Sequence, residues 1–321
     1  MLLELLMVLG AAIIYLVSSL YFIPRFILLY EKAGITVNNY KERPLAPALG
    51  LAMLVSLMAG LAWISGWQFL SNIGLIGIEH ELGVDLRGTD IGLAFVAISM
   101  ALLGVFDDVM DENTRGLRGH LRSFQKGWLT AGMLKLSAGS LVVVIVVLNL
   151  EAFGGYGGAM PFKGGQVLDY YSELTSGHLM AVEIILRVIA FLVVLLWTNG
   201  MNLLDRRPGR ALKVFWVTGL ILSFMGIAWG HEEVFLLVPL LIFPLLLLPV
   251  DLKERAMLGD AGANLMGGVL GFFGVLMLPF PALLVFGIAG LLLNLSGELV
   301  SLTEVIERNR FLFFLDKLGR I

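Results

Sequence analysis

The sequence has no cysteine and little charge. None of its 321 residues is a cysteine, and 15% are charged, compared with about 25% in a soluble globular domain. The missing cysteines exclude thiol catalysis, cysteine-ligated zinc and a disulfide-stapled fold. A net charge of −3 provides no electrostatic basis for binding nucleic acid. The four histidines are scattered along the chain, so a histidine metal cluster is not expected.

Apolar residues, in contrast, are in excess. They make up 58% of the chain, and the mean hydropathy is +0.90. A membrane-spanning helix needs about 20 mostly apolar residues. We therefore predict an all-α polytopic membrane protein with about nine transmembrane helices. The nine apolar stretches lie at about 2–22, 49–66, 91–106, 127–150, 180–198, 214–229, 233–250, 264–278 and 281–299.

The basic residues predict the orientation of the chain. If the nine spans alternate in direction, 18 of the 22 lysines and arginines fall on one side of the membrane. The positive-inside rule assigns that side to the cytoplasm, which places the N-terminus outside and the C-terminus inside a plasma membrane. Residues 1–300 then form a single transmembrane domain. Residues 301–321, with the apolar run Phe311–Leu315, are predicted to form a cytoplasmic amphipathic helix.

Three acidic motifs lie at the predicted cytoplasmic ends of three different spans. They are Gly104–Asp108, Asn199–Asp205 and Leu258–Gly262. Because all three motifs are predicted to lie at the same membrane depth and on the same face of the membrane, their carboxylates could converge. Converging carboxylates repel one another unless a cation lies between them, and oxygen ligands suit Mg²⁺ or Mn²⁺. The sequence therefore predicts a divalent metal site at the cytoplasmic membrane surface.

Basic residues accompany these acids. Lys135 is predicted to lie inside the fourth span, where an ionisable residue is a functional candidate. Together, carboxylates, a hard metal and cations at a membrane surface indicate phosphoryl transfer to an acceptor dissolved in the membrane. The loop residues that fit phosphate recognition are Lys126, Arg206, Arg207, Arg210 and Arg122.

Structural roles for the same residues remain open. Asp107 and Asp108 could form a solvated helix end, and Asp205 or Asp260 could be a helix N-cap. The pair Arg206-Arg207 could be a topology signal, and Lys135 could extend its amine to the interface. Two further charged residues, Glu183 and Arg187, are spaced i,i+4 and are predicted to form a structural ion pair.

The acidic motifs, in this order, resemble those of the polyprenyl-phosphate N-acetylhexosamine-1-phosphate transferases. Gly104–Asp108 resembles the family's G-x-x-D-D segment, Asn199–Asp205 its N-x-x-N-L-x-D segment, and Gly259–Gly262 its G-D-x-G segment. The resemblance covers residues 40–270. It implies Mg²⁺-dependent transfer of a sugar-1-phosphate from a UDP-sugar to undecaprenyl phosphate, with release of UMP at the cytoplasmic face. A homodimer would be unsurprising in this family.

The resemblance also implies roles for individual residues. Asp260 takes the role of a magnesium ligand, and Asp107 and Asp108 take the roles of the family's aspartate pair, as metal ligands or catalytic groups. Lys135 resembles the lysine that follows this pair, and Arg43 lies near the expected position of a nucleotide-binding lysine. With the basic residues above, the candidates for substrate binding are Asn202, Asp205, Arg206, Arg207, Arg210, Lys126 and Arg43.

The sequence departs from the family pattern in two places. After Asp205 it continues with Arg206-Arg207-Pro208-Gly209, so Pro208 replaces an aspartate associated with the nucleobase. The family's histidine motif in the last cytoplasmic loop is absent. These departures leave open a different nucleotide donor, or a non-catalytic paralogue that binds lipid phosphate as a scaffold in envelope assembly. A transporter would carry polar groups near the bilayer midplane within inverted repeats, which this sequence lacks.

Overall fold

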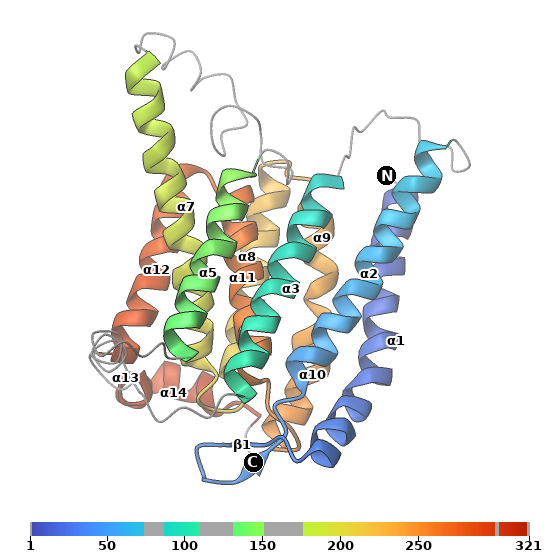
Figure 1. Ribbon diagram of the computed structural model, residues 1–321, viewed down its shortest axis with the longest axis vertical. Coiled ribbons are helices and arrows are strands. Elements are labelled where there is room, and N and C mark those ends of the chain that lie inside the picture. The colour runs from blue at the N-terminus through green and yellow to red at the C-terminus, as the bar shows by residue number, and fades with distance from the viewer. Residues whose placement is uncertain (1, 74–86, 110–130, 151–175, 299–301, 320–321) are drawn as a thin grey trace.

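The computed structural model describes residues 2–73, 87–109, 131–150, 176–298 and 302–319 (Figure 1). These residues form a bundle of helices and one short hairpin. The helices are α1 (Leu2–Ala33), α2 (Leu49–Asn72), α3 (Arg87–Val109), α5 (Ala131–Leu148), α7 (Ser176–Leu204), α8 (Arg210–Ala228), α9 (Val234–Leu240), α10 (Ile242–Leu252), α11 (Gly259–Met277), α12 (Phe280–Glu298), α13 (Leu302–Arg308) and α14 (Arg310–Lys317). The strands are β1 (Val37–Asn38) and β2 (Pro44–Leu45).

The bundle has the length and composition of a membrane-embedded protein. Within the described residues, seven helical spans are long and apolar enough to cross a bilayer, and α9 with α10 counts as one of them. Two shorter apolar segments, Ser137–Leu148 of α5 and Phe280–Ser296 of α12, lie in the fourth and ninth predicted stretches. The all-α membrane fold is therefore confirmed, whereas the count of nine crossings and the orientation stay predictions.

The seventh predicted stretch is interrupted. Helices α9 and α10 meet at Leu241, whose N–H donates to the carbonyl of Val238 at 3.1 Å. Pro244, the third residue of α10, has no N–H to donate to the carbonyl of Leu240, so one helical hydrogen bond is missing where α9 and α10 meet. The apolar pattern identified the span but not this break.

Helix α11 is the centre of the bundle (Figure 1). In the apolar 18-residue segment of α11, 94% is buried inside the protein, compared with 28% in the corresponding segments of α1 and α7. Glycines let the α11 backbone touch its neighbour α7. A Cβ added at Gly267 would lie 2.5 Å from Thr198 Cα, and one added at Gly271 would lie 2.7 Å from Val194 Cα. Only glycine permits such close backbone packing.

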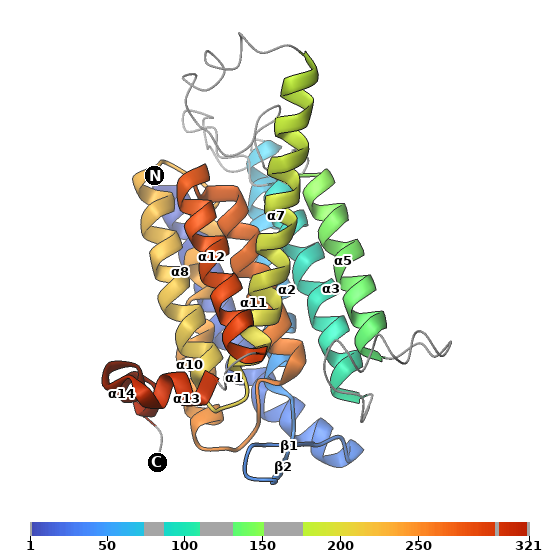
Figure 2. The same cartoon turned by 90° about the vertical axis from the view of Figure 1, so that its left-hand side faces the viewer.

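One end of the bundle carries the irregular polar segments (Figure 2). We call it the polar end, formed by the hairpin Val37–Leu45, the segment Asp205–Gly209 after α7 and the segment Lys253–Leu258 before α11. The hairpin pairs Val37 with Leu45, and its exit is joined to the segment before α11 by hydrogen bonds. The Met257 N–H donates to the carbonyl of Ala46 at 2.9 Å, and the Leu49 N–H donates to the carbonyl of Met257 at 3.2 Å.

The C-terminal tail corrects one prediction. Residues 302–317 form two short helices, α13 and α14, in place of one continuous amphipathic helix. The chain turns at Asn309, whose side-chain oxygen accepts hydrogen bonds from the N–H groups of Phe311 and Leu312 at 3.0 and 3.2 Å. Asn309 is thus the N-cap of α14, and asparagine is among the strongest residues at this position.

Candidate functional site

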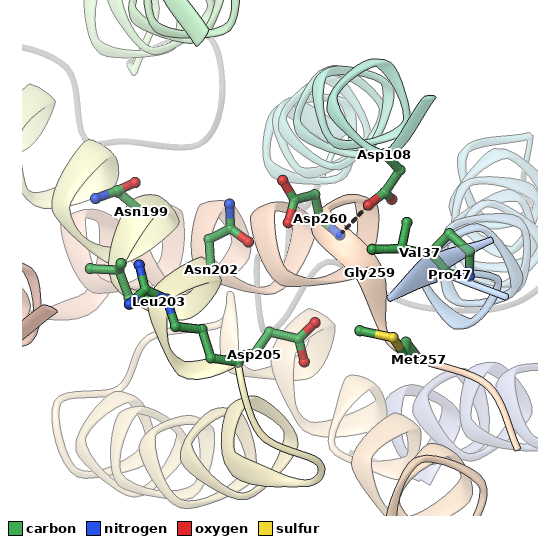
Figure 3. Close-up of a pocket in the computed structure, with 11 residues that line it drawn as sticks. Val37, Pro47, Asp108, Asn199, Asn202, Leu203, Asp205, Met257, Gly259 and Asp260 are labelled. Carbon is green, nitrogen blue, oxygen red and sulfur yellow. Dashed lines mark hydrogen bonds between the residues drawn. The ribbon is translucent and has the colours of Figure 1, made fainter. Parts of the chain in front are cut away.

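A pocket of about 240 Å³ opens at the polar end (Figure 3). All three acidic motifs contribute side chains to it: Asp108 from α3, Asn202 and Asp205 from the end of α7, and Asp260 from α11. The predicted convergence of the three motifs is therefore observed. The full lining is Val37, Pro47, Asp108, Asn199, Asn202, Leu203, Asp205, Arg206, Met257, Gly259 and Asp260.

The start of α11 is capped by a residue from another helix. Gly259 has a left-handed φ of +73°, and Leu258 at the N-cap position offers no side-chain cap. In its place, Asp108 Oδ1 accepts from the Asp260 N–H at 3.0 Å (Figure 3). Asp108 Oδ2 accepts from the Ala261 N–H at 3.3 Å. An aspartate at the end of its own helix is disfavoured by the helix dipole, but here the carboxylate lies at the positive end of α11.

Glycine contacts bring the capping aspartate to this position. A Cβ added at Gly104, one turn before Asp108, would lie 2.3 Å from Ala261 Cα. A Cβ added at Gly50 would lie 2.2 Å from the backbone nitrogen of Gly262. Real side chains do not approach so closely, so α2, α3 and the start of α11 can pack only with glycine at these positions. The glycines of the motifs are packing residues that place the aspartates.

Asp205 lies in the turn after α7, facing the same pocket. Its N–H donates to the carbonyls of Met201 and Asn202 at 3.1 and 3.3 Å, which closes the helix. Burial raises the pKa of Asp205 well above its ordinary value, and the negative charges of Asp251, Asp260 and Asp108 raise it further. A hydrogen bond from the backbone of Gly259 opposes the shift.

The donor set fits a hard divalent cation. Asp260, Asn202 and Asp205 present oxygen atoms to one pocket, and Asp108 adds negative charge beside them. Among the described residues, no group of three or more histidine, aspartate or glutamate side chains is arranged so that it could hold a metal ion by itself. Magnesium does not require such a group, because it usually takes one or two carboxylates and completes its coordination with water and phosphate oxygens.

The basic candidates occupy different places. Arg206 lines the pocket, and the guanidinium of Arg207 lies 4.3 Å from the ring centre of Tyr40 in the hairpin. The guanidinium of Arg43 is exposed and lies 3.7 Å from a carboxylate oxygen of Glu254. Arg210 is absent from the pocket lining and forms a buried ion pair with a C-terminal aspartate, Asp316. Of the predicted phosphate ligands in the described part of the chain, Arg206 alone borders the pocket.

Two acidic residues near the site were not singled out from the sequence. Asp251 at the end of α10 is 4% exposed, and its Oδ2 accepts from the Gly209 N–H at 2.6 Å. Glu254 holds the hairpin, since its carboxylate accepts from Lys41 Nζ at 2.5 Å and from Tyr40 Oη at 3.2 Å. Both lie where an apolar span ends, which is the same signal that identified the three motifs.

Several predictions fall partly or wholly outside the described residues. Lys126 and Arg122 are not described, and Lys135 is described only as a residue of the second turn of α5. Asp107 precedes Asp108 in α3 and does not line the pocket. The predicted ion pair of Glu183 and Arg187 is confirmed, with two nitrogens of the arginine 3.0 and 2.7 Å from Glu183 Oε1.

The alternative role of Asp260 as an N-cap is wrong. Asp260 lies inside the first turn of α11, and the capping carboxylate is that of Asp108. Asp205 likewise does not cap α8, which begins at Arg210 after Gly209.

No known family model matches this chain, and no curated protein matches it.

Proposed function

We propose that this protein is a membrane phosphoglycosyl transferase. It moves a sugar-1-phosphate from a nucleotide-sugar, with a UDP-sugar favoured, to a polyprenyl phosphate such as undecaprenyl phosphate. The reaction depends on Mg²⁺ or Mn²⁺ and takes place at the cytoplasmic face of the plasma membrane, in cell-envelope glycan synthesis. The observation that carries the proposal is the convergence of Asp108, Asn202, Asp205 and Asp260, from three separate segments, on one pocket at the end of an apolar bundle.

The proposed metal ligands are Asp260 and, beside it, Asp205 or Asn202. When bound there, Mg²⁺ supplies positive charge that neutralises the diphosphate of the donor. Burial is the main cause of the raised pKa of Asp205, and the negative charges of Asp251, Asp260 and Asp108 raise it further. A cation relieves the repulsion among these charges, which supports a divalent ion at this place.

The chain's own residues hold and orient the two phosphates in this proposal. An oxygen of the lipid phosphate dianion attacks the sugar-side phosphorus of the donor, and the bond from that phosphorus to the bridging oxygen breaks. A nucleoside monophosphate dianion leaves, so charge balances without net proton transfer. Arg206 stabilises the negative charge on the oxygens of the transferring phosphoryl group, and Asp108 keeps Asp260 in position through its cap.

The pocket size fits part of the donor. Pockets for drug-sized ligands have about 300–1,000 Å³, and this one has about 240 Å³. It therefore accommodates the diphosphate and metal, while the nucleoside and the sugar extend toward solvent or toward the hairpin. In the hairpin, the ring of Tyr40 lies under the guanidinium of Arg207, the residue that follows the pocket residue Arg206.

The test is release of a nucleoside monophosphate. The purified protein receives undecaprenyl phosphate, Mg²⁺ and a panel of UDP-, CDP-, GDP- and dTDP-sugars. We expect lipid-dependent release with one donor class, and a loss of about a thousandfold in Asp260→Asn, which corresponds to about 4 kcal/mol of barrier. Glu31→Gln is the matched control, because Glu31 is an exposed carboxylate at the same end of the bundle.

A non-catalytic lipid-phosphate binder is the second candidate. It is favoured by the use of Asp108 as a helix cap and by the burial of Arg210 in an ion pair, since both residues then have structural roles. This candidate predicts no nucleotide release from any donor, with Mg²⁺-dependent binding of undecaprenyl phosphate by the folded protein. That result would overturn the transferase proposal, and release from a donor other than a UDP-sugar would change only the donor.

A further inference from the structure

Helices α13 and α14 lie across the end of the bundle, whereas the other helices run along it (Figure 2). They lie at the polar end in both views (Figure 1). One side of α14 is attached to the start of α8, and another side carries exposed apolar residues. These two sides have different surroundings, and no residue in the described part of the chain covers the apolar side.

The attachment to α8 is a buried ion pair with added hydrogen bonds. Arg210 Nε and Nη2 lie 2.6 and 2.9 Å from the two carboxylate oxygens of Asp316, and the side chains are 5% and 8% exposed. Lys213 Nζ donates to the carbonyls of Leu315 and Asp316, both at 2.9 Å. Two cations in the first turn of α8 are unfavourable for its dipole, and the negative end of α14 compensates for them.

The outer side of α14 is an apolar stripe. Phe311, Phe314 and Leu315 follow the spacing i, i+3 and i+4, which puts them on one face of α14, and Leu318 comes directly after the end of the helix. All four are exposed, Phe311 by 68% and Phe314 by 62%. Nothing in the described part of the chain covers this stripe, and so large an apolar face at the end of a membrane bundle needs an apolar environment.

The surroundings of the stripe indicate lipid. Arg308, Arg310 and Lys317 are exposed beside it, and cations flanking an apolar stripe are typical of helices that lie in the headgroup region of an anionic bilayer. Helix α8, to which α14 is attached, exposes Trp216 less than two turns after Arg210, followed by further apolar residues. Tryptophan is enriched where a membrane helix leaves the hydrocarbon. Helix α8 therefore exposes apolar side chains within two turns of the point where α14 is attached to it.

We propose that α14 is an interfacial membrane helix, with its stripe in the headgroup region of an anionic bilayer, and that the Arg210–Asp316 pair transmits its position to the start of α8. Arg210 directly follows the segment Asp205–Gly209, whose first two residues line the pocket. Contact of α14 with lipid thus fixes one wall of the pocket. The effect on catalysis rests on the proposed function, whereas the lipid contact and the attachment do not.

The absence of native cysteine allows a direct test of membrane depth. Single-cysteine variants Phe314→Cys and Glu307→Cys are labelled with a nitroxide, in nanodiscs of phosphatidylethanolamine and phosphatidylglycerol. We expect the label at 314 to be more accessible to oxygen than to a water-soluble nickel chelate, and the label at 307 to show the opposite. Equal, high accessibility of both labels to the chelate would overturn the interfacial position. A label at 314 that is inaccessible to both oxygen and the chelate in nanodiscs would indicate a protein contact and would also overturn it.

The attachment is tested by a distance between two labels, at Phe314→Cys and Glu31→Cys. We expect a narrow distance distribution in nanodiscs that broadens when Asp316→Asn is added, while the label at 314 stays at its membrane depth. An unchanged distribution would overturn the role of the ion pair. If both spectroscopic results are as expected and no nucleotide is released by any variant, the proposed function fails and this inference stands.

Discussion

The starts of α11 and α8 are built from the same parts, yet one borders the candidate site and the other does not. Each helix starts at a glycine with a left-handed φ: Gly259, at +73°, is the first residue of α11, and Gly209, at +77°, directly precedes α8. Each is capped by an aspartate from the end of another helix, Asp108 for α11 and Asp251 for α8. A left-handed glycine and a remote carboxylate together replace the usual N-cap side chain.

The two starts differ in the charge of the first helical turn. The first turn of α11 contains Asp260, whose carboxylate gains from the helix dipole and faces the pocket. The first turn of α8 contains Arg210 and Lys213, which need the negative end of α14 as a counter-charge. The same backbone design therefore holds a candidate metal ligand in one place and a structural attachment in the other.

The largest expected difference comes from removing the two capping carboxylates. Asp108→Ala is expected to lower nucleotide release at least a hundredfold, because Asp260 loses its positioning and the site loses a charge; a hundredfold corresponds to about 2.7 kcal/mol. Asp251→Ala leaves the buried N–H of Gly209 unpaired and is expected to lower the free energy of unfolding by about 1–3 kcal/mol. Most activity per folded molecule is retained in Asp251→Ala. Release rates and thermal unfolding of both variants in detergent check this, and equal activity losses would show that the two starts are functionally alike.

A smaller difference is expected between the two glycines. An alanine at either position would have to adopt the left-handed φ, which costs about 1–2 kcal/mol for a residue with a Cβ. The Cβ at position 259 would lie 2.7 Å from Pro47 Cβ and 2.9 Å from Asp108 Oδ2, both fixed groups. At position 209 it would lie 2.7 Å from Leu252 Cδ2, the movable end of a leucine.

Gly259→Ala is thus expected to lower the unfolding midpoint more than Gly209→Ala does, and to reduce nucleotide release as well. Thermal unfolding and release assays on the two purified variants provide the comparison. A larger loss of stability in Gly209→Ala would contradict the contacts described for these two positions.

The smallest expected effect is a pH dependence of stability at Glu254, which lies in the chain between the starts of α8 and α11. The hydrogen bond from Lys41 holds the pKa of Glu254 below its ordinary value. A carboxyl with a lowered pKa contributes stability that is full above its ordinary pKa and is lost as the pH falls through the lowered value. We expect Glu254→Gln to lower the unfolding midpoint slightly at neutral pH, with the difference from wild type vanishing at strongly acidic pH.

Glu42→Gln is the matched control for this pH series. Glu42 is an exposed glutamate of the hairpin and, like Glu254, has a left-handed φ. Its variant is expected to follow the wild type at every pH. A constant difference between Glu254→Gln and the wild type across the series would show that the carboxylate does not act through its charge.

The spans and the acidic motifs were predictable because their signals are local. A stretch of apolar residues must be helical in a bilayer, since each backbone group needs a partner within its own segment. Asp107–Asp108, Asp205 and Asp260 stood out because charged residues are rare in this chain and lie just where apolar runs end. The i,i+4 pair of Glu183 and Arg187 was predictable for the same reason, as its geometry depends on one helix alone.

Contacts between remote segments were not predictable. The sequence suggested that Asp260 could cap its own helix, but the cap is Asp108, 152 residues earlier in the chain. Arg210 was grouped with Arg206 as a phosphate ligand, and its actual partner, Asp316, is 106 residues away. Spacing along the chain cannot decide between such partners, because several arrangements of the helices satisfy the same apolar pattern.

The sequence by itself determined that this chain is a bundle of membrane helices with acidic motifs at the ends of several spans. It did so through hydropathy and chain spacing, which act within one segment. Only the tertiary structure decided which of the polar residues meet. That decision depends on glycines such as Gly104 and Gly50, which let α2, α3 and α11 approach to backbone contact and thereby set where each carboxylate lies. Because glycine has no side chain, it adds no charge or apolar signal to the sequence, and its effect on packing appears only in the folded structure.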